Sequence, residues 1–244
     1  MRYSRSPMTQ TLDLVGGGPG AVLALRRHFK SALDALGRSR PLVAYVGVAS
    51  DDNRGFFAMM RGALGSGHAT LKLAKIASPR ASASEARALL DDCDLVFVSG
   101  GDVEHGMKVL HDRDMAGHLV RLGRTGKPMF AISAGSLMLA REWVRFPDED
   151  DESKAELFPC LGLAPLHVDA HSEDDGWSEL RVLVRLLHER GDAQPVGYGL
   201  TRHGGLHISI DGEDVAVRPI GTPIPRIVVR RGKVVEGAAL PLAQ

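Results

Sequence analysis

A serine in a cramped turn is the residue of this sequence best suited to chemistry. Ser133 stands in the segment AISAG, after an apolar run at 129–132 that predicts a buried strand and before residues 136–140, which predict a helix. Small residues around a serine at a strand-to-helix turn are typical of a nucleophile elbow, where the helix N-terminus favours developing negative charge. The alternative is a serine that merely caps the helix.

A pair of glycines could complete such a site. Ser99-Gly100-Gly101-Asp102 follows the apolar run at 95–98, and glycine lets the backbone approach a ligand closely. The N–H groups of Gly101 and Ala134 could together form an oxyanion hole. The alternative is that the glycines only form a tight turn between a strand and a helix.

Two histidines four positions apart offer a proton acceptor. A serine hydroxyl is a weak nucleophile at neutral pH, so an imidazole must take its proton, and His167 and His171 are both candidates. The same spacing could place both rings on one metal ion, with Asp169 between them. That arrangement needs a helix, and Pro165 and the β-branched residues nearby argue against one, so we expect no metal.

Composition narrows the class of protein. The chain has 244 residues, 44% hydrophobic and 25% charged, and a formal net charge of +0, which does not favour a broad basic face for nucleic acid. The apolar runs are too short to span a bilayer, so we expect no membrane partner. Cys93 and Cys160 could form one disulfide, but we expect reduced thiols. The N-terminus has no apolar segment of a secretory signal, and we predict a cytoplasmic protein.

Strand-like and helix-like segments alternate along the first two thirds of the chain. They predict an α/β fold with a doubly wound, mostly parallel sheet and helices on both faces. The predicted strands are 12–15, 42–48, 70–76, 95–98 and 129–132, and the predicted helices are 22–36, 56–64, 84–92 and one or two within 103–122. Ligands of such sheets bind beyond the carboxyl ends of the strands, where Ser133 and Gly101 would meet.

The last third predicts an acidic loop at 146–152, a helix at 178–189 and extra short strands at 196–200, 206–210, 215–217 and 227–229. We predict a disordered leader at 1–10 and a single domain over 11–244, because no linker is evident. Gly16 to Gly20 resembles a dinucleotide-binding loop only loosely, since Ala21 replaces its third glycine. We interpret it as a tight turn and expect no cofactor.

Three motifs in this order resemble one family. Ser-Gly-Gly-Asp, Ile-Ser-Ala-Gly-Ser and Leu-Phe-Pro-Cys-Leu-Gly-Leu-Ala-Pro-Leu-His-Val-Asp-Ala-His are similar to the serine peptidases of the dipeptidase E and cyanophycinase group. The resemblance runs from about Leu12 to Val217. It implies a glutamine amidotransferase-like fold and a serine peptidase with Ser133 as nucleophile and His171 as general base, His167 remaining the competitor.

The resemblance leaves the orienting acid less well defined. Asp148 reproduces the dipeptidase E spacing, with Asp150 and Asp151 as neighbouring alternatives. The cyanophycinase acid would come from the segment Gly-Tyr-Gly-Leu-Thr-Arg, which carries Arg202 in place of an acidic residue. Asp102 is a further departure, because a carboxylate close to an oxyanion hole opposes the charge that develops there.

The resemblance also implies the substrate. We expect a small peptide, with an acidic residue on the acyl side as in aspartyl dipeptides, cleaved through an acyl-enzyme. Arg181, Arg185 or Arg202 would supply the matching cation, and Asp102 would also face the substrate. Alternatives are a catalytically silent homologue that binds a small ligand or a partner protein, and a hydrolase that uses Ser133 on a non-peptide amide. A homodimer is left open.

Overall fold

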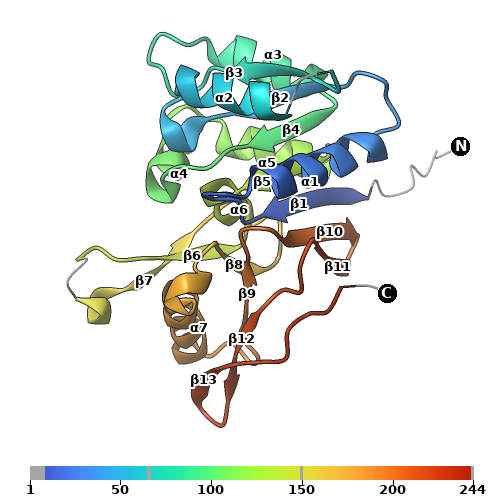
Figure 1. Cartoon of the computed structure of the whole chain (residues 1–244). Coiled ribbons are helices and arrows are strands. Elements are labelled where there is room, and N and C mark those ends of the chain that lie inside the picture. Colours follow the sequence, from blue (N-terminus) through green and yellow to red (C-terminus); the bar gives the residue numbers. More distant parts are fainter. Residues whose placement is uncertain (1–8, 65–66, 149–150, 243–244) are drawn as a thin grey trace, which may run out of the picture.

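The computed structural model describes residues 9–64, 67–148 and 151–242. Its centre is a seven-stranded sheet in the order β11-β10-β1-β5-β4-β2-β3 (Figure 1). These strands are Gln10–Val15 (β1), Leu42–Val46 (β2), Thr70–Ala74 (β3), Leu95–Val98 (β4), Met129–Ile132 (β5), Gly205–Asp211 (β10) and Asp214–Ile220 (β11). The first five run parallel, and the β10–β11 hairpin joins β1 antiparallel.

Helices cover both faces of this sheet, because its central strands are apolar on both sides. Every residue of β4 and β5 is buried, as expected for parallel strands between two helical layers. Val22–Ala35 (α1) and Arg54–Leu64 (α2) cover one face. The other carries Ala83–Asp92 (α3), Val103–Asp112 (α4), Ala116–Arg124 (α5) and Ala134–Leu139 (α6). The predicted fold class is confirmed.

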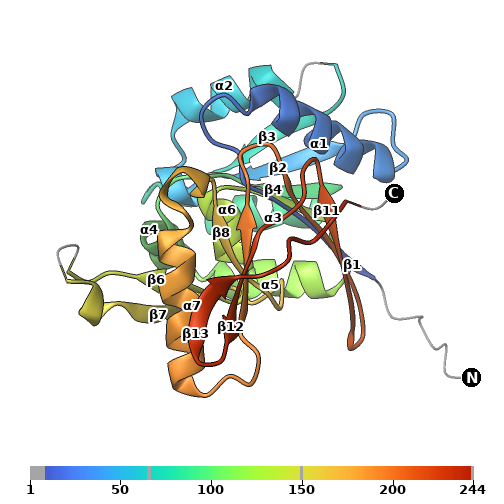
Figure 2. The same cartoon turned by 60° about the horizontal axis from the view of Figure 1, so that its bottom comes forward.

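The last third contains the predicted helix and short strands, together with strands and a second sheet that the sequence did not predict. Four strands form a separate sheet, in the order β13-β12-β9-β8, with the helix Ser178–Arg190 (α7) packed on it (Figure 2). These strands are His167–Ala170 (β8), Val196–Leu200 (β9), Arg226–Arg230 (β12) and Lys233–Glu236 (β13), and Glu142–Arg145 (β6) pairs with Glu156–Pro159 (β7) in a hairpin. The sequence analysis did not predict β6, β7, β8 and β13, which are four residues long and polar at several positions.

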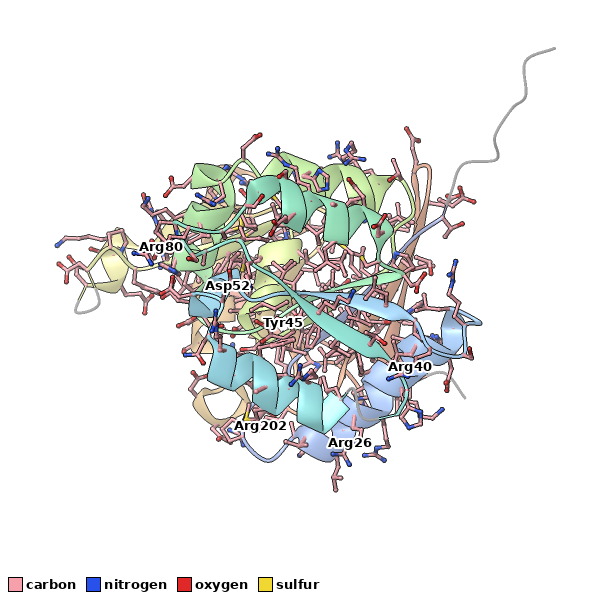
Figure 3. The ribbon with its side chains drawn as sticks, turned by 90° about the horizontal axis from the view of Figure 1, so that it is seen from above. Arg26, Arg40, Tyr45, Asp52, Arg80 and Arg202 are labelled. Carbon is pink, nitrogen blue, oxygen red and sulfur yellow. The ribbon has the colours of Figure 1, made fainter. Side chains whose placement is uncertain are left out.

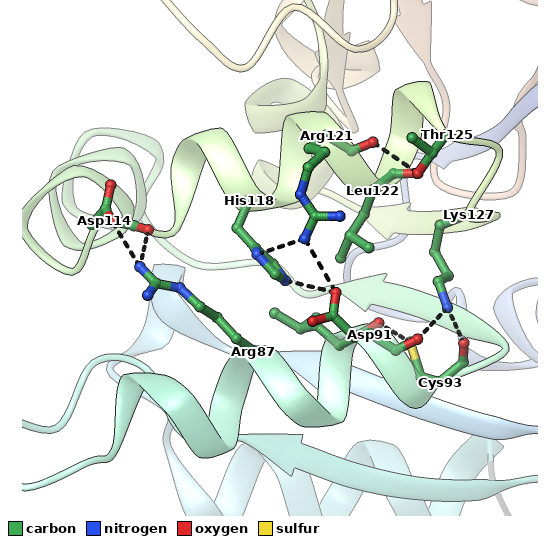
Figure 4. A network of polar contacts seen from close by, with 10 residues as sticks. Arg87, Asp91, Cys93, Asp114, His118, Arg121, Leu122, Thr125 and Lys127 are labelled. Atoms are coloured by element: carbon green, nitrogen blue, oxygen red, sulfur yellow. Dashed lines mark hydrogen bonds and ion pairs between the residues drawn. The ribbon is translucent and has the colours of Figure 1, made fainter.

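Polar contacts connect α3 with α5 on the surface (Figure 4). Arg121 Nη2 donates to Asp91 Oδ1 at 3.3 Å, and His118 Nε2 lies 3.1 Å from the same oxygen. Lys127 Nζ donates to the carbonyls of Asp91 and Cys93 at the start of β4. These contacts hold the N-terminal ends of the central strands, at the edge of the sheet opposite Ser133.

The N-terminal segment and the two cysteines bear on smaller expectations. The predicted leader lies outside the described residues up to residue 8, and Gln10 already belongs to β1, where its side chain donates to the Leu163 carbonyl at 2.9 Å. Cys93 and Cys160 are both free thiols. Within the described ranges, no helix has the length and apolar character needed to cross a membrane.

Candidate active site

Ser133 forms the sharp turn between β5 and α6. Its backbone has φ 51° and ψ −128°, a conformation that residues with a side chain rarely adopt. Strain of this kind costs roughly 1–3 kcal/mol and persists where the surroundings impose it. Here the Ser133 N–H donates to the carbonyls of Val15 and Gly16 at 3.0 and 3.1 Å, so the end of β1 holds the turn in place.

Ser136 is a buried positioning residue that the sequence analysis did not single out. Its hydroxyl accepts from the Val15 N–H at 3.1 Å and donates to the Val15 carbonyl at 3.0 Å. These two bonds fasten the first turn of α6 to the end of β1. A serine three positions after the nucleophile was the available signal, but nothing in the sequence pointed to Val15 as its partner.

His171 reaches Ser133 from the second sheet. It directly follows β8, and its N–H donates to the Leu200 carbonyl at the end of β9 at 2.8 Å. Its Nε2 lies 2.8 Å from Ser133 Oγ, which fits a hydrogen bond from the hydroxyl to an unprotonated imidazole nitrogen. The structure therefore brings the predicted nucleophile and base into contact.

Gly100 and Gly101 line the other side of the serine. A Cβ on Gly100 would lie 3.1 Å from the Ser133 Cβ, and one on Gly101 would collide with the Ala49 carbonyl oxygen at 1.9 Å. Gly101 also has φ 146°, which favours glycine. Among the backbone hydrogen bonds of the described residues, none uses the N–H of Gly101 or Ala134. Both predicted oxyanion donors are therefore available.

The loop that carries Ala49 is held in place by the side chain of Asp52. Asp52 Oδ2 accepts from the N–H groups of Ile76 and Ala77 at 2.6 and 2.7 Å, which ties this loop to the end of β3. Figure 3 shows Asp52 close to Tyr45 of β2, seen from above. This anchor fixes Ala49, and Ala49 in turn fixes the position of Gly101.

The glycine-rich turn after β1 belongs to the site, which the sequence analysis did not predict. A Cβ on Gly18 would lie 3.3 Å from Cγ of His171, so this turn packs against the imidazole ring. The position of the turn after the first strand was visible in the sequence, but a contact with a residue of another sheet was not. We therefore assign it to shaping the site rather than to binding a nucleotide.

The predicted orienting acid, Asp148, contacts a lysine of the same loop. Asp148 Oδ2 accepts from Lys154 Nζ at 2.5 Å, and no hydrogen bond or ion pair recorded for the described residues joins Asp148 to His171. Asp151 caps the turn at Ser153, while Asp150 lies outside the described residues. The role of Asp148 remains a prediction.

Glu173 is one of several carboxylates that lie close to His171 along the chain. It follows His171 by two residues, and its Oε1 accepts from the Arg202 N–H at 2.9 Å. His171 is bound at Leu200, so both residues are held against the same end of β9. The second oxygen of Glu173, Oε2, is buried without a hydrogen-bond partner among the described residues. The acidic turn after the histidine was visible in the sequence but was not considered for this role.

The predicted substrate-binding side chains already have partners within the chain. Asp102 Oδ1 accepts from the His105 N–H at 2.6 Å and caps α4, which directs this oxygen to the helix terminus. Arg181 Nε donates to the Gly176 carbonyl at 2.8 Å, and Arg185 contacts Glu152 and Glu189 at 3.2 and 3.3 Å. Arg202, labelled in Figure 3, pairs with Asp174.

His167 has a different environment from His171. Its Nε2 lies 3.3 Å from Glu142 Oε2, and burial lowers the pKa of this imidazole despite the carboxylate. The two histidines thus bind different partners, Glu142 and Ser133. Within the described ranges, no group of three or more His, Cys, Asp or Glu side chains is placed to hold a metal ion.

A second Ser-His-Asp arrangement lies on the antiparallel edge of the main sheet. Asp13 Oδ1 is 2.7 Å from His207 Nδ1, and His207 Nε2 is 3.2 Å from Ser209 Oγ. Ser209 is in a regular strand between β1 and β11, so ladder hydrogen bonds occupy the backbone there. In the described part of the chain, backbone N–H groups that could bind an oxyanion are free beside Ser133, whereas those beside Ser209 are used in the sheet.

Comparison with known proteins identifies the family of this chain. The sequence profile of peptidase family S51 matches residues 14–217, which include Ser133, Gly101 and His171. The chain belongs to peptidase family S51. This family of serine-type peptidases is the one to which the sequence motifs pointed, and the suspected dipeptidase E kinship is confirmed.

Individual relatives of this S51 chain are distant. Peptidase E of Streptomyces coelicolor is 28% identical over 152 residues, which cover 61% of this chain and 60% of that relative. The crystal structure of a peptidase from an acI-B1 Actinobacterium has a TM-score of 0.71 at 16% identity, covering 99% of this chain and 100% of the other. A Listeria monocytogenes EGD-e protein proposed to be a peptidase E has a TM-score of 0.60 at 17% identity, covering 87% and 99%. These two structures support the fold alone.

Proposed function

We propose that this S51 chain hydrolyses small peptides through an acyl-enzyme on Ser133. The observation that supports this most directly is the 2.8 Å separation of Ser133 Oγ and His171 Nε2 at a strained elbow. A positioned imidazole can take the hydroxyl proton as the oxygen attacks the scissile carbonyl carbon. The strained turn presents that oxygen clear of the sheet.

The remaining steps follow from the groups around the serine. The carbonyl oxygen becomes negatively charged in the tetrahedral intermediate, and the N–H groups of Gly101 and Ala134 are proposed to stabilise it. The protonated His171 then donates its proton to the leaving amine as the C–N bond breaks. Water attacks the acyl-enzyme with His171 again as base, which releases the acid and restores the Ser133 hydroxyl.

The orienting carboxylate is the part of the mechanism with two candidates. Asp148 has the spacing that the resemblance implies, but its carboxylate contacts Lys154. Glu173 has a buried, unpartnered oxygen and is two residues from the base. We favour Glu173 because it is in the turn directly after His171; the role requires its carboxylate to reach the imidazole, hold its tautomer and stabilise the imidazolium.

The proposed substrates are small peptides in general, a broader class than the aspartyl dipeptides that the resemblance implies. An aspartyl dipeptide needs a cation in the site, and Arg185 and Arg202 each pair with a carboxylate while Arg181 donates to a carbonyl. Recruiting one of these arginines would break an existing contact. We therefore propose small peptides, with aspartyl and isoaspartyl dipeptides as members of the test panel.

The test is covalent labelling combined with turnover. A fluorophosphonate probe should label the purified protein at Ser133, and labelling should disappear in Ser133→Ala. The same substitution should lower hydrolysis of a dipeptide panel by about 10⁴-fold or more, as in other serine triads. Full activity of Ser133→Ala would exclude this nucleophile. Absence of labelling and turnover in the parent protein would favour a catalytically silent homologue.

A further inference from the structure

A cavity of about 500 Å³ lies between α4, the β6 hairpin and the first turn of α7. Figure 1 shows these three elements on the same side of the molecule. Two of its lining segments begin at the site itself. Asp102 directly follows Gly101, and Ser178 and Glu179 follow the short turn after His171. The cavity therefore begins one residue beyond Gly101, a proposed oxyanion donor.

The lining of this cavity is acidic. Asp102, Glu104, Glu152 and Glu179 contribute carboxylates, and no Lys, Arg or His is among the described lining residues. Three of these carboxylates are compensated. Asp102 caps α4, Glu104 lies 3.5 Å from Arg145, and Glu152 lies 3.2 Å from Arg185.

Glu179 is different from the other three carboxylates. No ion pair to it is recorded in the described part of the chain, and its carboxylate is half-buried. Burial raises the pKa of Glu179, the neighbouring Trp143 indole lowers it, and the charge of Asp175 raises it again. A desolvated carboxylate without a cation is unfavourable, and a positive group entering the cavity would relieve it.

A second buried carboxylate lies behind Glu179. Asp169 on β8 is 4% exposed, and its Oδ2 has no hydrogen-bond partner among the described residues. Burial, together with the negative charge of Glu179, raises the pKa of Asp169 to about 7. Of the two side chains only Glu179 lines the cavity, and Asp169 becomes increasingly protonated below pH 7.

The walls of the cavity suit the stem and the head of a basic side chain. Trp143, Phe146 and Val182 provide apolar surface beside Glu179. Lysine and arginine bury their methylene stems against such surface and place the charged head at a carboxylate or over an aromatic ring. An acidic side chain would find no basic residue among the described lining residues.

We propose that this cavity is the specificity subsite of the peptidase and takes the ammonium or guanidinium group of a basic residue next to the scissile bond, with Glu179 as its partner. The proposal rests on the proposed function and reverses the charge preference that the resemblance implied. Glu179 pairs with the cation, and Trp143 packs on its stem. This preference is opposite to that of a site built for aspartyl peptides.

Binding can be tested without turnover. In Ser133→Ala, calorimetry would compare alanyl-lysine and lysyl-alanine with the dipeptides in which norleucine replaces lysine. Norleucine keeps the stem and lacks the charge. We expect one lysyl dipeptide to bind about tenfold more tightly than its norleucine counterpart, the effect of roughly one partly buried ion pair. Adding Glu179→Gln should remove this difference, whereas Glu213→Gln, in an exposed turn, should preserve it.

Turnover then separates this proposal from the proposed function. In the protein with Ser133 intact, Glu179→Gln should lower kcat/KM for the preferred lysyl peptide about tenfold. It should leave kcat/KM for the norleucine peptide unchanged. An active enzyme that prefers aspartyl peptides, or binds lysyl and norleucine dipeptides equally, would overturn the subsite and leave the peptidase intact. Lack of measurable binding by either lysyl dipeptide would overturn it as well. Charge-dependent binding by a protein without turnover would support the subsite and contradict the peptidase.

Discussion

Ser133 and His171 each follow the last residue of a strand, each has φ 51°, and their side chains meet at 2.8 Å. The two strands belong to different sheets, since β5 lies in the seven-stranded sheet and β8 in the four-stranded one. The site is therefore the junction of the two sheets. A backbone conformation disfavoured for both residues is maintained by contacts to β1 and β9 on either side.

Ser133→Gly should be more stable than Ser133→Ala, although both should be inactive. Glycine accepts the backbone conformation of residue 133 without strain, and alanine does not. Glycine also makes the unfolded chain more flexible, so we expect a net gain of about 1 kcal/mol in the free energy of unfolding over alanine. Chemical denaturation of both variants measures this. A more stable alanine variant would show that the turn is not strained.

Gly18→Ala should reduce turnover because the new methyl group would press on the His171 ring at 3.3 Å. Gly20→Ala is the matched control, since Gly20 also has positive φ and a Cβ there meets nothing within 4 Å. We expect kcat to fall about 10²-fold for Gly18→Ala, as for other small displacements of catalytic groups, and to stay near that of the parent for Gly20→Ala. Equal kcat values for both variants would remove the turn from the site.

His171→Ala should lose nearly as much activity as Ser133→Ala, because the members of such a unit do not contribute independently. His167→Ala should keep kcat within a few-fold, since His167 contacts Glu142 and not Ser133. The comparison needs steady-state kinetics on one cleaved dipeptide. If His167→Ala were the more damaging substitution, the base would have to be reassigned.

Glu173→Gln and Asp148→Asn distinguish the two candidate acids. Glutamine keeps an oxygen to accept from the Arg202 N–H but cannot stabilise an imidazolium, so kcat should fall toward the roughly 10⁴-fold loss seen without an orienting carboxylate. Asp148→Asn should change kcat little, because its carboxylate contacts Lys154 at the surface. Large losses in Asp148→Asn alone would restore the acid implied by the resemblance. Small losses in both would indicate a dyad.

Asp169→Asn should stabilise the protein at neutral pH. The pKa of Asp169 is raised to about 7 in the folded state from 3.8, so the folded protein binds this proton more tightly than the unfolded chain does. The contribution of Asp169 to the free energy of unfolding is therefore most favourable below pH 4. It is lost as the pH rises toward 7, and this loss is a few kcal/mol at most. Asparagine keeps an oxygen for the Ala170 N–H, which Asp169 Oδ1 accepts at 2.7 Å.

Unfolding free energies of the parent and Asp169→Asn between pH 4 and 8 measure this effect. The difference between them should grow in favour of asparagine as the pH rises. A difference that is constant over this range would mean that Asp169 does not titrate there. Glu179→Gln should reduce the effect, since the charge of Glu179 contributes to the raised pKa of Asp169.

Periodicity and small residues in the sequence determined the central sheet and the elbow. Continuous apolar runs such as 95–98 and 129–132 suit buried parallel strands, and they became β4 and β5 with the same bounds. The Ser-Ala-Gly turn marked Ser133 because a sharp strand-to-helix turn tolerates only small neighbours. These are local constraints, so neighbouring residues carry the whole signal.

Tertiary structure alone decided the partners of these residues. His171 and Gly18 are 153 positions apart, and their contact depends on β8 joining a second sheet whose short polar strands carry no strong pattern. The pairing of Arg185 with Glu152, the pairing of Arg202 with Asp174 and the acidic cavity likewise depend on where side chains of separate segments meet. Charge at a site is a sum over groups close in space, and spacing along the chain does not determine which groups those are.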